Sequence, residues 1–180
     1  MKKAGMSFFI GTVPSGELFS HQKKDRKTMA TVYIGSDHAG LELKAALVKR
    51  LSEKGMTSTT SAPPPRKLRT TPSMPRAVCG KVLADAGNAT PGDEPASFGD
   101  PLCGTGIGMS MTANHIPGIR AALCGCEFQA RATRQHNNAN VLCLGERVTG
   151  QGVALDIAEL FLNTAFEGGR HLRRINQIEG

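Results

Sequence analysis

Short β-branched runs that end in polar residues and lead into amphipathic helical repeats constrain the fold of this chain more than any other feature. The first such unit begins at residues 31–35 (TVYIG), whose β-branched and aromatic residues predict a strand. A polar turn over 36–40 follows. Leu43, Leu47 and Leu51 then recur at the four-residue spacing of a helix. Strand, polar turn and helix in this order open a βαβ unit, which favours parallel strands.

The same alternation returns in the second half of the chain. The pattern there predicts helices over 106–114, 127–135, 150–162 and 170–178, and strands over 119–124 and 140–144. We therefore expect an α/β fold of the Rossmann-like, three-layer α/β/α kind, with a mainly parallel sheet that typically has five strands. Because parallel strands end at one edge, the polar residues that follow them should converge there: Asp37 and His38, Cys103 to Gly106, and Arg147.

The middle of the chain breaks this alternation. Residues 56–76 are rich in proline and basic residues and contain no acidic residue, so we place no strand there. A short helix fits 77–86, and 87–101 reads as loop. The expected organisation is an appended or disordered tail over 1–28 and a single domain over 29–180, with an irregular segment at 56–101 that leaves its second strand in doubt. We hypothesise that Met56 to about Arg76 is translated out of frame, which sequencing the transcript would test.

Composition narrows the function classes. The net charge is +7, but the basic excess lies in residues 1–29 and 56–76, outside the regular elements, so nucleic-acid binding is not favoured. No apolar run approaches the roughly 18 residues of a membrane span. The 5 cysteines are scattered, which argues against a disulfide framework or a structural zinc site and favours a reducing compartment such as the cytoplasm.

The run at 102–110 (LCGTGIGMS) is the strongest candidate for chemistry. Its glycines let backbone amides approach a ligand, and a helix that starts here would direct its positive end at the same point. That geometry suits a phosphate or an enediolate and would favour the thiolate form of Cys103. On spacing alone, a tight turn with a buried cysteine is as good an interpretation. His136, at the predicted end of a helix, is a second group that could move protons near neutral pH.

Several motifs together carry a family resemblance. They are GSDHAG at 35–40, CGTGIGMS at 103–110, AN at 113–114, PGIRA at 117–121, RQHN at 134–137, GER at 145–147 and GRH at 169–171. In order and spacing they resemble ribose-5-phosphate isomerase B and its relatives, the galactose-6-phosphate isomerase subunits. The resemblance covers about residues 29–55 and 102–179, and the combination is specific although each motif alone is weak.

The resemblance implies interconversion of D-ribose 5-phosphate and D-ribulose 5-phosphate through an enediolate, without metal or cofactor. It assigns Cys103 as the base and His136 as the acid that opens the sugar ring, with Thr105 also in the catalytic set. The substrate-binding set that it implies is Asp37 at the sugar hydroxyls, His38, Arg170 and Arg174 at the phosphate, Gly104, Gly106 and Gly108 at the enediolate, and Asn137 and Arg147. It also implies a homodimer or a dimer of dimers with sites completed across the interface.

The middle segment departs from the family pattern, which normally has a second strand, an Asp-Tyr-Pro motif and an apolar strand leading into the cysteine. Here residues 98–101 (FGDP) precede the final Leu102-Cys103. Isomerisation of a six-carbon sugar phosphate and an inactive phosphosugar-binding relative therefore stay open as alternatives. A flavodoxin-like nucleotide binder would use the same glycines, but it gives no role to Cys103 together with His136.

Overall fold

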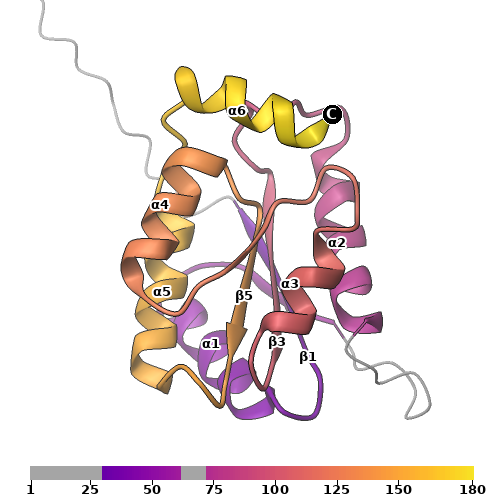
Figure 1. The fold of residues 1–180 in the computed structure, drawn as a ribbon. Helices are drawn as coiled ribbons and strands as arrows, with labels where there is room; N and C mark the ends of the chain where they lie inside the picture. The colour runs from indigo at the N-terminus through magenta and orange to yellow at the C-terminus, as the bar shows by residue number, and fades with distance from the viewer. Residues whose placement is uncertain (1–29, 62–71) are drawn as a thin grey trace, which may run out of the picture.

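The protein forms one five-stranded sheet in the order β2-β1-β3-β5-β4, and every neighbouring pair is parallel (Figure 1). The structure is a computed structural model that describes residues 30–61 and 72–180, so the predicted tail over 1–28 lies outside the described residues. In chain order the elements are β1 (Thr31–Ser36), α1 (Leu41–Glu53), β2 (Ser58–Thr60), α2 (Ser73–Ala86), β3 (Ser97–Cys103), α3 (Ile107–Ala113), β4 (Ala121–Leu123), α4 (Glu127–Asn137), β5 (Val141–Gly145), α5 (Gln151–Asn163) and α6 (Arg170–Glu179).

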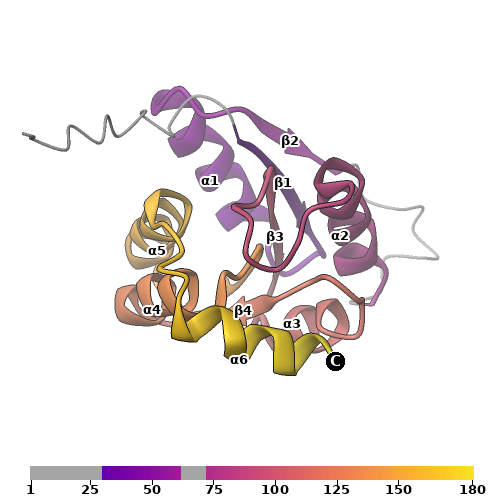
Figure 2. The ribbon, with the colours of Figure 1, turned by 90° about the horizontal axis from the view of Figure 1, so that it is seen from above.

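Helices cover both faces of the sheet, which confirms the predicted three-layer α/β/α class. Figure 2 shows α1, α4 and α5 on one side and α2 and α3 on the other, with α6 crossing one end. The leucines that predicted α1 are buried against α5, where Ile157 and Phe161 are also buried. On the opposite face, Met74 of α2 and Met109 of α3 belong to a second buried cluster. These four helices thus bury their apolar stripes in the two clusters on either face of the sheet. None of the described helices is long and apolar enough to cross a bilayer.

The structure corrects three predictions in the middle segment. β2 lies within 56–76, where no strand was expected, and β3 begins at Ser97, inside the expected loop. Helix α2 begins at Ser73 rather than at residue 77. Pro75 is compatible with this start because an amide in the first turn has no partner within the helix. The two strands were not predicted because their own composition does not indicate a strand clearly. Hydrogen bonds to the neighbouring strand β1 place them in the sheet.

Two glycines allow α2 to approach the sheet. A Cβ atom at Gly35 of β1 would lie 2.7 Å from Val78 Cγ2, and one at Gly99 of β3 would lie 2.8 Å from Val78 Cγ1. Separations this short are not tolerated between carbon atoms, so Val78 packs directly on the backbones of both strands.

The three central strands end at the same edge. In register, Ser36 of β1 is opposite Leu102 of β3, and Cys103 of β3 is opposite Gly145 of β5. The residues that follow these strands therefore meet at the carboxyl edge of the sheet, where parallel α/β folds bind their ligands.

Candidate active site

Backbone hydrogen bonds tie together the loops after β1, β3 and β5. The Asp37 amide donates to the Leu102 carbonyl at 3.1 Å, and the Arg147 amide donates to the Gly104 carbonyl at 2.9 Å. The side chain of Arg147 lies over Gly104, where an added Cβ would be 3.2 Å from Arg147 Cδ. The predicted convergence of Asp37, Cys103 and Arg147 on one edge is confirmed.

The thiol of Cys103 is buried and held at the carboxyl end of β3. Its Sγ accepts a hydrogen bond from the Gly106 amide at 3.0 Å. Gly106 has φ 75° and directly precedes α3. A side chain there would be strained by its left-handed backbone and would lie 2.5 Å from Leu123 Cδ1. The loop is therefore a tight turn with a buried cysteine, and it also directs an amide at the sulfur.

Thr105 and Gly108 flank Gly106 in this loop. Thr105 is exposed, and its Oγ1 accepts a hydrogen bond from the Ile107 amide at 3.4 Å. Gly145 of β5 has no room for a Cβ, which would lie 2.5 Å from the Thr105 carbonyl carbon. Gly108 is the second residue of α3, a position whose amide has no partner within the helix. The loop thus offers a hydroxyl and backbone amides beside the thiol.

Asp37 and His38 form the turn between β1 and α1. The Asp37 carboxylate is buried, and its Oδ1 accepts the Ala39 amide at 2.8 Å. His38 is exposed. Gly40 packs against the end of β3, where an added Cβ would lie 3.0 Å from Leu102. The turn is thereby held beside Cys103 with the His38 ring free to meet a ligand.

The remaining candidates lie at the opposite edge of the sheet. Each helix that follows a strand runs back to the amino edge, and His136 and Asn137 are the last two residues of α4. The next residue, Asn138, donates from Nδ2 to the Pro91 and Asp93 carbonyls at 2.9 and 2.7 Å, in the loop before β3. β3 spans about 20 Å from this loop to Cys103, at about 3.3 Å per residue. One chain therefore does not bring Cys103 and His136 together.

The basic helix α6 lies at the same amino edge. Arg170 and Arg174 are exposed on it, and Figure 1 shows α6 beside the end of α4, away from the loops that follow β3 and β5. The Glu167 amide donates to the Gln135 carbonyl at 3.1 Å, which fixes the segment before α6 to α4. His136, Asn137, Arg170 and Arg174 thus form a second group, separate from that of Cys103.

His171 also belongs to this second group. It was not predicted as a site residue, although the GRH motif contains it. Its buried ring stacks on His136 with the centroids 4.4 Å apart and the planes 10° from parallel. Burial lowers the pKa of His171, and the neighbouring His136 and Arg170 lower it further. The ring of His171 is consequently neutral near pH 7 and presents a flat face to His136.

A cation could in principle be held by His136, Glu167 and His171, whose ligand atoms all lie within 4.8 Å of one another. The two stacked rings argue against this use. Imidazole nitrogens bind a metal with lone pairs that lie in the ring plane, and the planes of parallel rings do not meet. The arrangement is better described as a stacked histidine pair with a carboxylate beside it.

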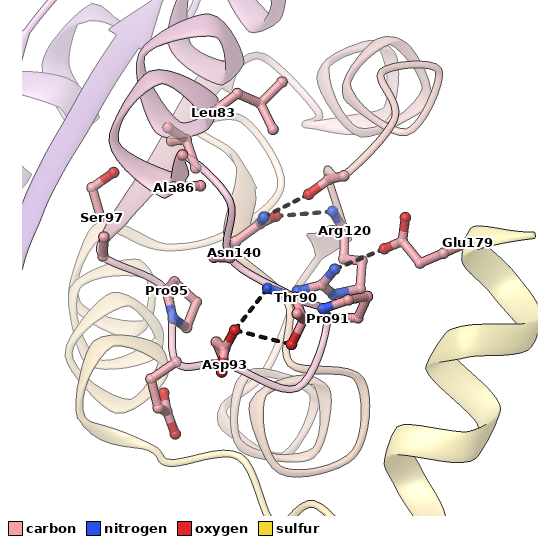
Figure 3. Close-up of a pocket in the computed structure, with 16 residues that line it drawn as sticks. Leu83, Ala86, Thr90, Pro91, Asp93, Pro95, Ser97, Arg120, Asn140 and Glu179 are labelled. Atoms are coloured by element: carbon pink, nitrogen blue, oxygen red, sulfur yellow. Dashed lines mark hydrogen bonds and ion pairs between the residues drawn. The ribbon is translucent and has the colours of Figure 1, made fainter.

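A cavity of about 260 Å³ also lies at the amino edge, between the end of α2 and α6 (Figure 3). Several of its polar side chains bond to the protein itself. Arg120 pairs with Glu179 at 2.7 Å, Asp93 accepts from Thr90, and Asn140 bonds to Gly118 and Arg120. The cavity therefore presents few groups to a ligand, and the chemistry lies elsewhere.

The matching family model is described as Ribose/Galactose Isomerase, and it covers residues 32–178. The fold and this match define an isomerase-family protein of the α/β class. The chain belongs to the ribose/galactose isomerase family.

Individual relatives agree with this assignment. Ribose-5-phosphate isomerase B of Escherichia coli is 36% identical over 150 residues, 83% of this chain and 95% of that protein. The putative sugar phosphate isomerase YwlF of Bacillus subtilis is 56% identical over 77 residues, 43% of this chain and 52% of that protein. The structure of ribose-5-phosphate isomerase B from Mycoplasma genitalium with bound ribulose-5-phosphate has 35% identity and a TM-score of 0.74, over 84% of this chain and 95% of that one.

Proposed function

We propose that this protein interconverts D-ribose 5-phosphate and D-ribulose 5-phosphate. The observation that carries the proposal is the buried Cys103 thiol at the carboxyl edge of the central strands, with the Gly106 amide 3.0 Å from its sulfur. Membership of the ribose/galactose isomerase family, and a relative whose structure contains ribulose-5-phosphate, support the choice of substrate. Six-carbon sugar phosphates are the competing substrates.

In this mechanism the Cys103 thiolate removes the proton from C2 of the open-chain aldose. An enediolate forms as the C1 oxygen takes up the charge. The thiol then returns the proton to C1, the proton of the O2 hydroxyl passes to O1, and O2 becomes the ketose carbonyl. Backbone amides of Gly104 to Gly108 and the Thr105 hydroxyl stabilise the developing charge on the oxygens, because they are already oriented by the tight loop.

The sugar and phosphate contacts follow from the two groups of residues. Asp37 accepts hydrogen bonds from sugar hydroxyls, and Arg147 lies over Gly104 beside them. His38 reaches the phosphate from the same edge. Arg170 and Arg174 supply the guanidinium groups that suit phosphate oxygens, and His136 with Asn137 acts in opening the ring.

A second copy of the chain completes each site in this proposal. Support comes from the separation of the two groups: Cys103 and His136 lie at opposite edges of the sheet, about 20 Å apart along β3. Ile107 and Met111 of α3, next to the Cys103 loop, are 48% and 64% exposed. Apolar side chains exposed beside a half-built site are suited to a homodimer interface, whether in a dimer or in a dimer of dimers.

We further propose that the protein works in the cytoplasm. Its five cysteines are all free, and four of them are buried thiols. A reducing compartment preserves such thiols, Cys103 among them.

The first test is conversion of ribose 5-phosphate by the purified protein beside Cys103→Ala. Activity in the wild type and a loss of at least about a hundredfold in the variant support the proposal, because general acid–base groups contribute about 10² to 10⁴. A folded wild type that leaves ribose 5-phosphate unchanged but converts galactose 6-phosphate or allose 6-phosphate reassigns the substrate. A folded wild type inactive on all three identifies a non-catalytic relative.

The shared site is tested by mixing two inactive variants. Cys103→Ala and His136→Asn are refolded together at equal amounts. If sites combine residues of two chains, half of the dimers are mixed, each with one intact site, and about a quarter of the wild-type activity returns. No recovery in a mixture shown by mass to contain hybrid dimers contradicts the shared site.

A further inference from the structure

Glu146 links the end of β3 to the first turn of α1 at the Cys103 edge, and its carboxylate is bonded to the protein itself. It follows β5 directly, and its amide donates to the Cys103 carbonyl at 2.9 Å. Its side chain turns to another element, where Oε2 accepts the Leu43 amide at 2.8 Å. The residue lies 103 positions from Leu43 in sequence and joins the end of β3 to the start of α1.

The bond to Leu43 is a capping interaction supplied from a distance. Leu43 is the third residue of α1, so its amide has no partner within the helix. The N-cap residue is Gly40, which has no side chain to accept that amide. A carboxylate at this end also interacts favourably with the helix dipole. Glu146 thus replaces the local cap that the sequence omits.

The consequence reaches the turn that contains Asp37 and His38. That turn is bounded by β1 on one side and by the start of α1 on the other. Its β1 side is fixed by the Asp37 amide, 3.1 Å from the Leu102 carbonyl. Its α1 side is fixed by Glu146, which is itself bonded to Cys103. Both ends of the turn are therefore held by β3 and by the residue that follows β5. These bonds fix the distance between the turn and the Cys103 thiol.

We infer that Glu146 is a positioning residue that holds the Asp37–His38 turn in register with Cys103. It acts through the backbone of α1 and not by touching the substrate. The inference rests on the proposed isomerase function. Because the turn binds the part of the substrate that does not react, its loosening weakens the binding of substrate and transition state alike.

The test compares Glu146→Ala with Glu146→Gln, whose side-chain carbonyl can still accept the Leu43 amide. We expect Glu146→Ala to raise KM for ribose 5-phosphate about tenfold with kcat changed less than about twofold, the pattern of lost uniform binding. Glu146→Gln should restore most of the difference. Glu42→Ala is the matched control, since Glu42 is an exposed carboxylate of the same first turn. An unchanged KM in Glu146→Ala, or a Gln variant no better than Ala, overturns the inference.

Hydrogen exchange separates this inference from the proposed function. Amides of residues 37–43 should exchange faster in Glu146→Ala than in the wild type, and the Gln variant should resemble the wild type. Unchanged exchange in Glu146→Ala overturns the inference whatever the kinetics show. If the wild type has no isomerase activity, the proposed function fails, and exchange alone then decides whether Glu146 fixes the turn.

Discussion

β3 and β5 lie side by side in the centre of the sheet, and both are buried along their whole length, yet their sequences have little in common. β5 is VLCLG, an apolar run of the kind expected for a strand covered on both faces. β3 is SFGDPLC and includes a serine, an aspartate and a proline. A buried strand can thus be specified by its own composition or by the strands on either side of it.

The polar residues of β3 lower the stability of the fold, because some of their buried atoms have no hydrogen-bond partner. Ser97 Oγ and Asp100 Oδ1 are buried without a hydrogen-bond partner. Complete burial raises the pKa of Asp100 well above its usual range, so the folded carboxyl keeps its proton at a pH where a free aspartate has lost it. Pro101 has no amide to donate and is paired with Gly35 of β1. β3 keeps its place because β1 and β5 bond to it on both sides.

Of the changes that test the contrast between β3 and β5, an aspartate in β5 should have the largest effect on stability. Leu142→Asp replaces an apolar side chain that packs in the core with a carboxyl that has no partner. We expect a loss of at least about 3 kcal/mol in the free energy of unfolding, from cavity formation and from the buried polar group together. Urea denaturation followed by circular dichroism measures it. Leu142→Ile is the control, and a cost below 1 kcal/mol for Asp would mean that β5 tolerates polar residues as β3 does.

Making β3 resemble β5 should stabilise the protein. Asp100→Val removes the buried carboxyl and introduces a β-branched residue that favours a strand. Its expected gain is about 1 to 3 kcal/mol in the free energy of unfolding at pH 7, measured by the same denaturation. Asp100→Asn keeps the size and a polar group, so it should gain less than Val. A destabilised Val variant would show that the carboxyl has a favourable partner in the fold.

The contrast should also appear in the pH dependence of stability. In the unfolded chain Asp100 loses its proton near pH 4, whereas in the fold its raised pKa keeps the proton on. Between about pH 4 and the raised pKa of Asp100 the folded state therefore binds more protons, and stability falls as pH rises, by up to about 1.4 kcal/mol per pH unit. The neighbouring thiols do not add to this slope, since burial raises the pKa of Cys124 to about 12 and raises the pKa of Cys143 well above its usual range.

Comparing unfolding at pH 4 to 7 in the wild type and in Asp100→Val isolates this contribution. The variant should lack the component of the slope that is due to Asp100. Equal slopes in the two proteins would show that Asp100 ionises alike in the folded and unfolded states.

The smallest effect is expected at the start of β3. Ser97→Ala removes a buried hydroxyl that has no partner, so the free energy of unfolding should rise by less than about 1 kcal/mol. Thermal unfolding would record the shift. A fall in the unfolding temperature would mean that the Ser97 hydroxyl has a hydrogen-bond partner in the fold. This end of β3 would then resemble β5 in leaving no buried polar side chain unpaired.

Prediction from sequence succeeded where local composition and final environment agree. β1, α1, β5 and α5 have the periodicity of their buried faces, so their existence and approximate bounds were predicted. β2 and β3 were missed because β2 has only three residues beside a proline-rich run and β3 contains an aspartate and a proline, so that only pairing with β1 and β5 places them in the sheet. The start of α2 was missed because Pro75 is typical of a loop except in a first turn.

The sequence by itself determined the parallel α/β architecture and the edge at which Asp37, Cys103 and Arg147 meet, because strand ends and glycine-rich turns are local features. Only the tertiary structure separated these residues from His136, Arg170 and Arg174. Each helix after a parallel strand runs back across the sheet, so residues at helix ends and residues at strand ends lie on opposite edges. The stacking of His171 on His136, and the bond from Leu43 to Glu146, likewise join segments distant in sequence. No local pattern encodes such contacts, since they exist only once the helices have packed on the sheet.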